Sequence, residues 1–149
     1  MKRVCFICLG NICRSTMAEF LFARLVADRN LQNEFYIQSR ATSSEAVGWG
    51  VYDGTAKILD RFLIDYSSKR STQLEKSDAD KYDFFICMDE SNISGTKRII
   101  KKTDGVICKL LDFSQDPRNV LDPYYTRDFE ATYRDISAGL EDFLSSLGY

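Results

Sequence analysis

A cysteine and an arginine six residues apart, Cys8 and Arg14, are the first residues of the chain whose spacing could carry out chemistry. That spacing alone is a weak signal, but here it lies between an apolar run and a helical pattern, in the segment Cys8–Ser15 with the sequence CLGNICRS. Backbone N–H groups converge on an anion where a loop leaves a strand and enters a helix. Gly10 can adopt the tight backbone conformation that such a loop needs. The segment therefore indicates a phosphate-binding loop.

The chemistry expected of this loop is attack on phosphorus by the Cys8 sulfur. A helix N-terminus and a nearby arginine both stabilise a thiolate, so Cys8 needs no histidine as base, and the chain has none. The Arg14 guanidinium matches phosphate oxygens as a planar fork. Ser15 is placed to donate a hydrogen bond to the thiolate, and Asn11 to fix the loop. The expected phosphate ligands are the backbone of Leu9, Gly10, Asn11, Ile12 and Cys13 together with Arg14.

The remaining cysteines favour buried thiols over a disulfide framework, because their number is odd: the chain contains Cys5, Cys8, Cys13, Cys87 and Cys108. Cys5 and Cys8 form a C-x-x-C pair, but side chains three apart on a strand point to opposite faces, which argues against a redox pair. A zinc site lacks a second pair of ligands. We expect no metal and no cofactor.

Length and charge are typical of a single-domain globular protein. Its 149 residues fit a single domain covering 1–149, and the formal net charge of −2 suggests neither a nucleic-acid nor a membrane partner. The apolar run Val4–Leu9 is too short for a secretory signal, and no stretch is long enough to span a bilayer. We expect a soluble, cytoplasmic protein.

Strand and helix patterns alternate along the chain. We expect strands at 3–8, 35–37, 82–88 and 106–111. We expect helices at 17–26, with Ser15 at or near its N-cap, at 54–64, from Asp89 onward and at 129–147, and loops at 39–53 and 113–127. This alternation predicts an α/β fold with a parallel sheet and right-handed crossovers. Ligands of such sheets bind at the carboxyl ends of the strands, where Cys8, Asp89 and the loop after the fourth strand lie.

Two further segments have ordinary structural explanations. Asp89 and Asn92 open a helix directly after a strand, so capping explains them better than contact with a substrate. The segment Ser67–Ser71 reads as a solvated loop, and docking through its cations Lys69 and Arg70 is the alternative.

At three places the chain resembles the low-molecular-weight protein tyrosine phosphatases. The segment Val4–Ser15, continued by Ala18 and Glu19, resembles the family's signature loop, while CMDESN at 87–92 and DPYY at 122–125 resemble two later motifs. The motifs span nearly the whole chain. The resemblance implies a four-stranded parallel sheet in the order 2-1-3-4, with helices on both faces. It also implies hydrolysis of phosphotyrosine in proteins, in opposition to a tyrosine kinase, without metal or cofactor.

The same resemblance implies a role for each matching residue. Cys8 becomes the nucleophile, Arg14 the phosphate clamp and Asp122 the general acid. Asn11 and Ser15 support the loop and the thiolate, and Tyr124 and Tyr125 flank the mouth of the pocket. Asp122 also fits the chemistry, since a phenolate leaving group benefits from a proton in the transition state. From the dipeptide alone, Asp122-Pro123 reads as a turn, and the family context favours the acid.

The chain departs from the family pattern at three points. Thr16 stands where proline is usual, which has little consequence in a first helical turn. The segment Ser39–Thr42 matches its landmark only loosely. Glu45 stands where relatives often carry an aromatic pocket wall. Trp49, four residues later, either replaces that wall or packs as an ordinary side chain.

Three other functions compete with this one. A thiol-dependent arsenate reductase of similar fold would need two further cysteines; Cys87 could be one, but its expected partner is Ser94. A non-catalytic phosphotyrosine-binding module should have lost the nucleophile or the acid. A redox sensor with a reversible Cys8–Cys13 disulfide is compatible with phosphatase activity.

Overall fold

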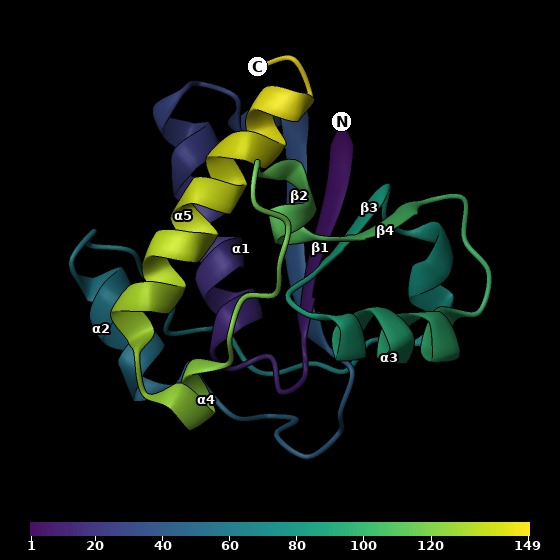
Figure 1. The fold of residues 1–149 in the computed structure, drawn as a ribbon, viewed down its shortest axis with the longest axis horizontal. Helices are drawn as coiled ribbons and strands as arrows, with labels where there is room; N and C mark the ends of the chain where they lie inside the picture. The colour runs from purple at the N-terminus through teal and green to yellow at the C-terminus, as the bar shows by residue number, and fades with distance from the viewer.

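Four parallel strands form the centre of the computed structural model, which describes residues 1–149 (Figure 1). The strands are β1 (Lys2–Cys8), β2 (Phe35–Ala41), β3 (Phe84–Cys87) and β4 (Val106–Lys109). Their order in the sheet is β2-β1-β3-β4. The predicted single α/β domain with sheet order 2-1-3-4 is therefore confirmed.

Helices cover both faces of this sheet, as expected. The helices are α1 (Arg14–Asp28), α2 (Asp53–Asp60), α3 (Glu90–Ile100), α4 (Pro123–Thr126) and α5 (Phe129–Ser146), with short 3-10 turns at Gln32–Glu34, Lys76–Asp80 and Leu110–Phe113. In Figure 1, α1, α2 and α5 lie on one side of the sheet and α3 on the other, while α4 lies at the end of the sheet away from both termini. No helix is both long and apolar enough to cross a membrane.

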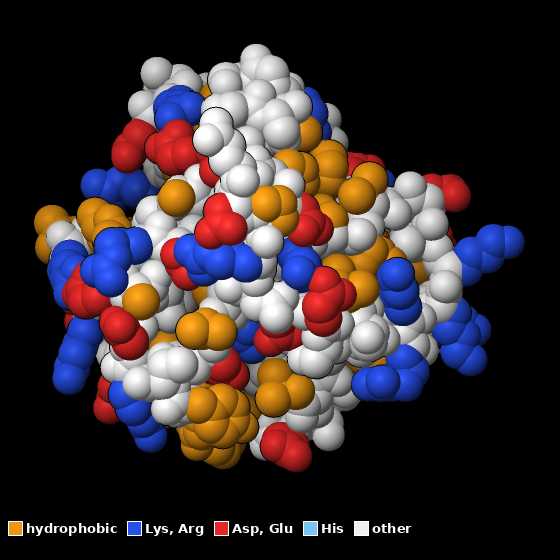
Figure 2. Space-filling model, viewed as in Figure 1, with side chains coloured by type: hydrophobic (Ala, Val, Ile, Leu, Met, Phe, Trp, Pro, Cys, Tyr) orange, Lys and Arg blue, Asp and Glu red, His pale blue; other side chains and the backbone are white.

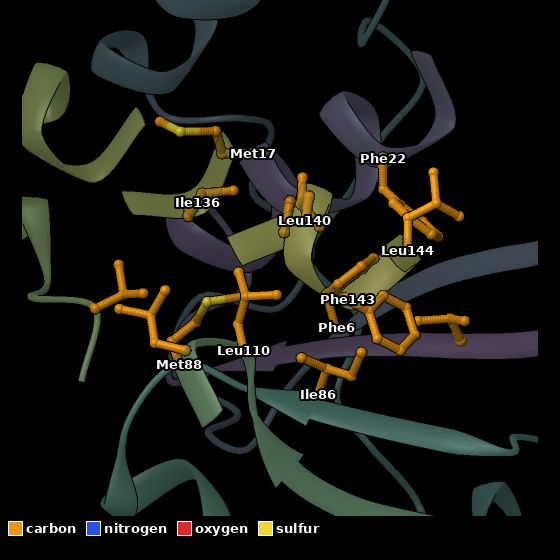
Figure 3. Close-up of a cluster of buried hydrophobic side chains, with 14 of the residues drawn as sticks. Phe6, Met17, Phe22, Ile86, Met88, Leu110, Ile136, Leu140, Phe143 and Leu144 are labelled. Atoms are coloured by element: carbon orange, nitrogen blue, oxygen red, sulfur yellow. The ribbon is translucent and has the colours of Figure 1, made fainter. Parts of the chain in front are cut away.

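The central strand β1 supplies side chains to two separate cores. Val4, Phe6 and Cys8 face α1 and α5 in the larger core, while Cys5 and Ile7 face α3 in the smaller one. This division follows from the period of two along a strand. Figure 3 shows Phe6 among the aromatic and aliphatic side chains of α1 and α5. Burying each such side chain contributes about 1.5–3 kcal/mol to folding, and this fixes the strand that ends at Cys8.

Strand β2 is longer than the sequence pattern predicted. It continues to Ala41 instead of ending at Ile37, because β1 pairs with it residue for residue as far as Cys8 opposite Ala41. The last three residues of the strand, Ser39–Ala41, were predicted as loop. Pairing with a neighbouring strand overrides such weak local preferences.

Other boundaries differ for local reasons. Helix α2 ends at Asp60 instead of residue 64, and Leu63 lies in the left-handed region at φ 57°. Strand β4 ends at Lys109, where the chain turns into a 3-10 helix. The predicted loop 113–127 contains the short helix α4, capped by the Asp122 side chain.

Candidate active site

The loop between β1 and α1 begins at Cys8 and ends where α1 starts, at Arg14. Its tight turn is made by Asn11, whose φ of 55° lies in the left-handed region, and Gly10 has no positive φ. The special backbone conformation predicted for Gly10 is therefore wrong, while its backbone N–H as a phosphate ligand stays a prediction. Asparagine adopts this conformation more readily than most residues. Ser15 lies inside the first turn of α1, and the N-cap is Cys13, with no side-chain hydrogen bond.

The Cys8 sulfur is surrounded by hydrogen-bond donors. The backbone N–H groups of Asn11 and Ser15 donate to it at 3.3 and 3.4 Å. The Ser15 hydroxyl oxygen lies 3.0 Å from the sulfur and accepts a hydrogen bond from the Asn11 amide at 2.7 Å. A thiol at Cys8 donates to this oxygen, and once the thiol is deprotonated the hydroxyl can rotate to donate its own proton to the sulfur. This arrangement suits a thiolate.

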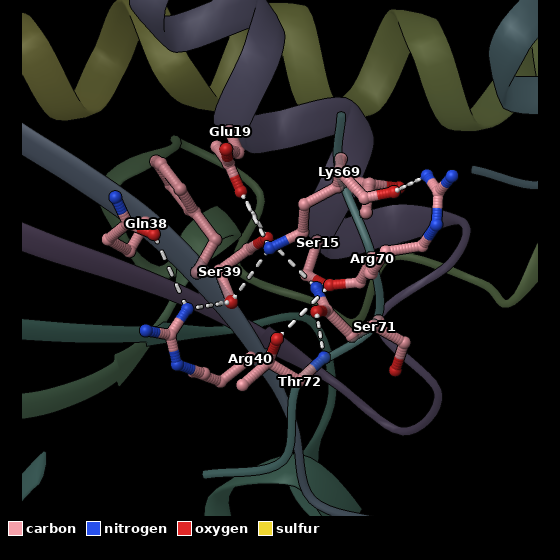
Figure 4. A network of polar contacts seen from close by, with 12 residues as sticks. Ser15, Glu19, Gln38, Ser39, Arg40, Lys69, Arg70, Ser71 and Thr72 are labelled. Carbon is pink, nitrogen blue, oxygen red and sulfur yellow. Dashed lines mark hydrogen bonds and ion pairs between the residues drawn. The ribbon is translucent and has the colours of Figure 1, made fainter. Parts of the chain in front are cut away.

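The Asn11 side chain is held by a polar network. Its amide also donates to Ser39 Oγ at 2.9 Å, and its Oδ1 accepts from the Thr72 backbone at 3.1 Å. Figure 4 shows Ser39 and Thr72 with the residues around them. Ser39 Oγ donates to the Glu19 carboxylate, which lies 3.2 Å from the Lys69 ammonium. Lys69 is thus largely buried in an ion pair, and its predicted place in a solvated loop is wrong.

Arg14 is buried, and both of its terminal nitrogens have partners. Its Nη1 donates to Asp89 Oδ2 at 2.7 Å and to the Val120 carbonyl at 2.8 Å, and its Nη2 lies 3.5 Å from Asp122 Oδ2. Burial lowers the pKa of Arg14, but the Cys8 sulfur and the two carboxylates outweigh it, so the pKa stands above its ordinary value.

Asp89 has two functions in the structure. It caps α3 as predicted, since its Oδ1 accepts from the Asn92 backbone at 2.9 Å. Its other oxygen holds Arg14, a contact that the sequence interpretation missed. Burial raises the pKa of Asp89, but hydrogen bonds from Arg14, Ser91 and Asn92 together outweigh it and lower the pKa.

A pocket opens above the loop. Its lining residues come from three separate segments: Cys8, Leu9, Gly10, Ile12, Cys13 and Arg14; Ser43, Glu45, Ala46 and Trp49; and Asp122, Tyr124 and Tyr125. The structure thus brings the expected loop, acid and aromatic residues together, and it places both Glu45 and Trp49 in the wall. Figure 2 shows hydrophobic side chains gathered over and beside α4 at this end of the molecule.

Asp122 lies at the rim of this pocket. Its Oδ1 accepts from the Tyr124 backbone at 3.0 Å as the cap of α4, and Pro123 occupies the first helical turn. Its side chain is 22 % exposed. The residue is therefore both fixed in position and open to a substrate.

The other thiols differ from Cys8 in their surroundings. Cys13 lines the pocket but is buried, which raises its pKa to about 12. Cys87 is fully buried in the α3 core beside Thr96, and burial raises its pKa to about 12 as well. All five cysteines are free. No group of three or more His, Cys, Asp or Glu side chains is arranged to hold a metal ion.

Known proteins share both the sequence and the fold. The family model described as low molecular weight phosphotyrosine protein phosphatase matches residues 3–149. The chain is 37 % identical over 145 residues to the low molecular weight protein-tyrosine-phosphatase PtpA of Staphylococcus aureus, covering 97 % of this chain and 92 % of that protein.

Two solved structures agree with this match. YfkJ from Bacillus subtilis is 36 % identical with a TM-score of 0.94, covering 99 % of this chain and 95 % of that one. The low molecular weight protein tyrosine phosphatase SP-PTP from Streptococcus pyogenes is 39 % identical with a TM-score of 0.87, covering 99 % and 93 %. The chain belongs to the low molecular weight phosphotyrosine protein phosphatase family and is a protein tyrosine phosphatase.

Proposed function

We propose that this phosphatase hydrolyses phosphotyrosine through a covalent phosphocysteine on Cys8. The Cys8 thiolate attacks phosphorus and forms the S–P bond, while the bond from phosphorus to the tyrosyl oxygen breaks. Asp122 donates its proton to that departing oxygen. Arg14 and the backbone N–H groups of residues 9–14 bind the three equatorial oxygens, where they stabilise the charge of the transition state.

The second step restores the enzyme. The Asp122 carboxylate accepts a proton from water, the resulting hydroxide attacks phosphorus, and the S–P bond breaks. Cys8 leaves as a thiolate, stabilised by the Ser15 hydroxyl. Inorganic phosphate is released, and Asp122 is again an acid. No group other than water is consumed.

One observation carries this proposal: two backbone N–H groups donate to the Cys8 sulfur at 3.3 and 3.4 Å and the Ser15 hydroxyl oxygen lies 3.0 Å from it, at the base of the pocket that Asp122 also lines. A structural cysteine in a core has no need of such donors. The free sulfur is instead prepared to carry negative charge, both as nucleophile and as leaving group.

Trapping the intermediate tests the mechanism. Acid quenching during turnover should yield protein labelled with phosphate on Cys8, and Cys8→Ser should give neither label nor turnover while keeping its thermal stability. Arg14→Lys should have severely reduced turnover, because an ammonium cannot bind two phosphate oxygens in the planar, bidentate way of a guanidinium. Substantial turnover by Cys8→Ser would exclude the mechanism.

The proposed substrates are phosphotyrosine-containing proteins of the cytoplasm, where the chain opposes a tyrosine kinase. A reducing compartment suits a mechanism that needs Cys8 as a free thiol. Cys8→Ser should retain bound phosphoproteins from a lysate, and vanadate should release them. Recovery of the same proteins by Cys8→Ser combined with Arg14→Ala would show that the capture does not depend on the phosphate site.

A further inference from the structure

The pocket wall between β2 and α2 carries a carboxylate with no partner. Glu45 lines the pocket, its side chain is exposed, and it takes part in no ion pair. Asp122, the other carboxylate of the lining, is close to Arg14. Glu45 is therefore the free negative charge at the mouth.

Glu45 is held in place by the phosphate-binding loop itself. Its backbone N–H donates to Ser43 Oγ at 3.1 Å, and the Ser43 N–H donates to the Leu9 carbonyl at 3.0 Å. A short hydrogen-bonded path thus links the start of this wall to the residue after Cys8. The backbone of Glu45 is thus anchored to the phosphate-binding loop, and the carboxylate stays within reach of the pocket mouth.

Trp49 completes the wall and is anchored in the same way. Its carbonyl accepts from the Ser71 N–H at 2.8 Å, and Ser71 Oγ donates to the Gly10 carbonyl at 2.8 Å. Its side chain is 55 % exposed although it lines the pocket. An exposed indole beside a free carboxylate provides two groups that attract a cation.

We propose that Glu45 and Trp49 select phosphotyrosine sites that have a lysine or arginine directly beside the phosphotyrosine. The inference rests on the proposed function and names its substrate class. With the phosphate on the loop, the substrate backbone crosses the mouth, and the neighbouring side chain reaches the wall. An exposed ion pair with an aromatic contact corresponds to a preference of about twofold to tenfold. Because the contact does not change during phosphoryl transfer, the preference lies in KM.

Matched phosphopeptides test this proposal. Each pair differs only in carrying lysine or acetyl-lysine, placed before the phosphotyrosine in one pair and after it in another. The wild type should favour lysine in at least one pair, and less so at high salt. Glu45→Gln should bring that ratio close to one, and Glu45→Lys should reverse it. Asp104→Asn, which removes an exposed carboxylate at the opposite edge of the sheet, should leave the ratio unchanged.

The outcomes separate this proposal from the phosphatase mechanism. Each protein's peptide rates are divided by its own rate on a small aryl phosphate, which carries no neighbouring side chain, so that a general loss of phosphatase activity in a Glu45 variant does not change the ratio. Equal lysine and acetyl-lysine rates at both positions in the wild type, or an unchanged ratio in Glu45→Gln, would overturn the selectivity alone. A wild type that cleaves the aryl phosphate but neither peptide pair would overturn the phosphotyrosine assignment with it.

Discussion

Arg14 and Asp89 lie 75 positions apart in the sequence and are joined by a hydrogen bond of 2.7 Å. The same nitrogen of Arg14, Nη1, also donates to the Val120 carbonyl. The rest of the Arg14 side chain borders the pocket. A clamp for a transferring phosphoryl group depends on such fixed orientation, because small displacements of a catalytic group cost large factors in rate.

Replacement of Asp89 by asparagine should separate its two functions. Asparagine caps a helix as well as aspartate does, so α3 should keep its N-terminus, while Arg14 loses its ion pair with Asp89 and keeps the one with Asp122. We expect kcat/KM for phosphotyrosine to fall by about 10- to 100-fold in steady-state assays. Asp128→Asn, at the cap of α5, is the matched control and should remain near wild-type activity. Equal effects of the two variants would contradict a role for Asp89 beyond capping.

Asp89 should also contribute to acid stability. Its pKa lies below its ordinary value of 3.8 in the folded protein, so the folded state favours the carboxylate. That contribution is complete well above pH 3.8 and is lost as the pH falls through the lowered pKa. The difference in melting temperature between wild type and Asp89→Asn should therefore shrink below this value. A difference that grows on acidification would contradict the ion pair.

Removal of the Ser15 hydroxyl should slow the second chemical step most. Ser15→Ala deprives the departing Cys8 thiolate of its donor, so breakdown of the phosphoenzyme should fall by about tenfold or more. A burst of phenol before steady turnover would reveal the accumulated intermediate. Thr16→Val is the control, because the Thr16 hydroxyl donates to the Cys13 carbonyl and not to sulfur. A burst of equal size in both variants would argue against the role of Ser15.

The rate lost when Asp122 is replaced should be larger for a substrate whose leaving group has greater need of a proton. Asp122→Asn retains the cap of α4 but has no proton to transfer. Phosphotyrosine should lose about 10²–10⁴-fold in single-turnover rate, and an aryl phosphate with a strongly electron-withdrawing ring should lose less. Equal losses for both substrates, accompanied by a lower melting temperature, would point to a structural turn.

Peroxide should inactivate the enzyme reversibly through Cys13. The Cys8 thiolate is oxidised to a sulfenic acid as peroxide is reduced, and the Cys13 sulfur then displaces water to form a disulfide. Since burial raises the pKa of Cys13 to about 12, closure should quicken as the pH rises toward that value. Cys13→Ser should lose activity that thiol reductants restore poorly. Peptide mapping without a Cys8–Cys13 crosslink would contradict the pathway but not the phosphatase mechanism.

The sequence by itself determined the features that depend on neighbouring residues. Cys8, Arg14 and Ser15 lie in one short segment, so their common loop follows from a strand running into a helix. The continuous apolar run of β1 and the positions of the long helices are likewise local patterns, and they were sufficient for the fold class. The resemblance supplied the strand order and led to Asp122, whose dipeptide alone indicated only a turn.

The tertiary structure alone decided which distant groups meet. Nothing near Arg14 in the sequence indicates Asp89 or the Val120 carbonyl, and nothing near Glu19 indicates Lys69. A hydrogen bond across the sheet leaves no periodic pattern in either segment, because it is set by how whole strands and helices pack. Tertiary contacts also decided that Asn11, and not Gly10, adopts the left-handed conformation in the loop. Its left-handed turn is maintained by bonds to Ser39 and Thr72, which reach the loop only when β2 pairs with β1 as far as Ala41.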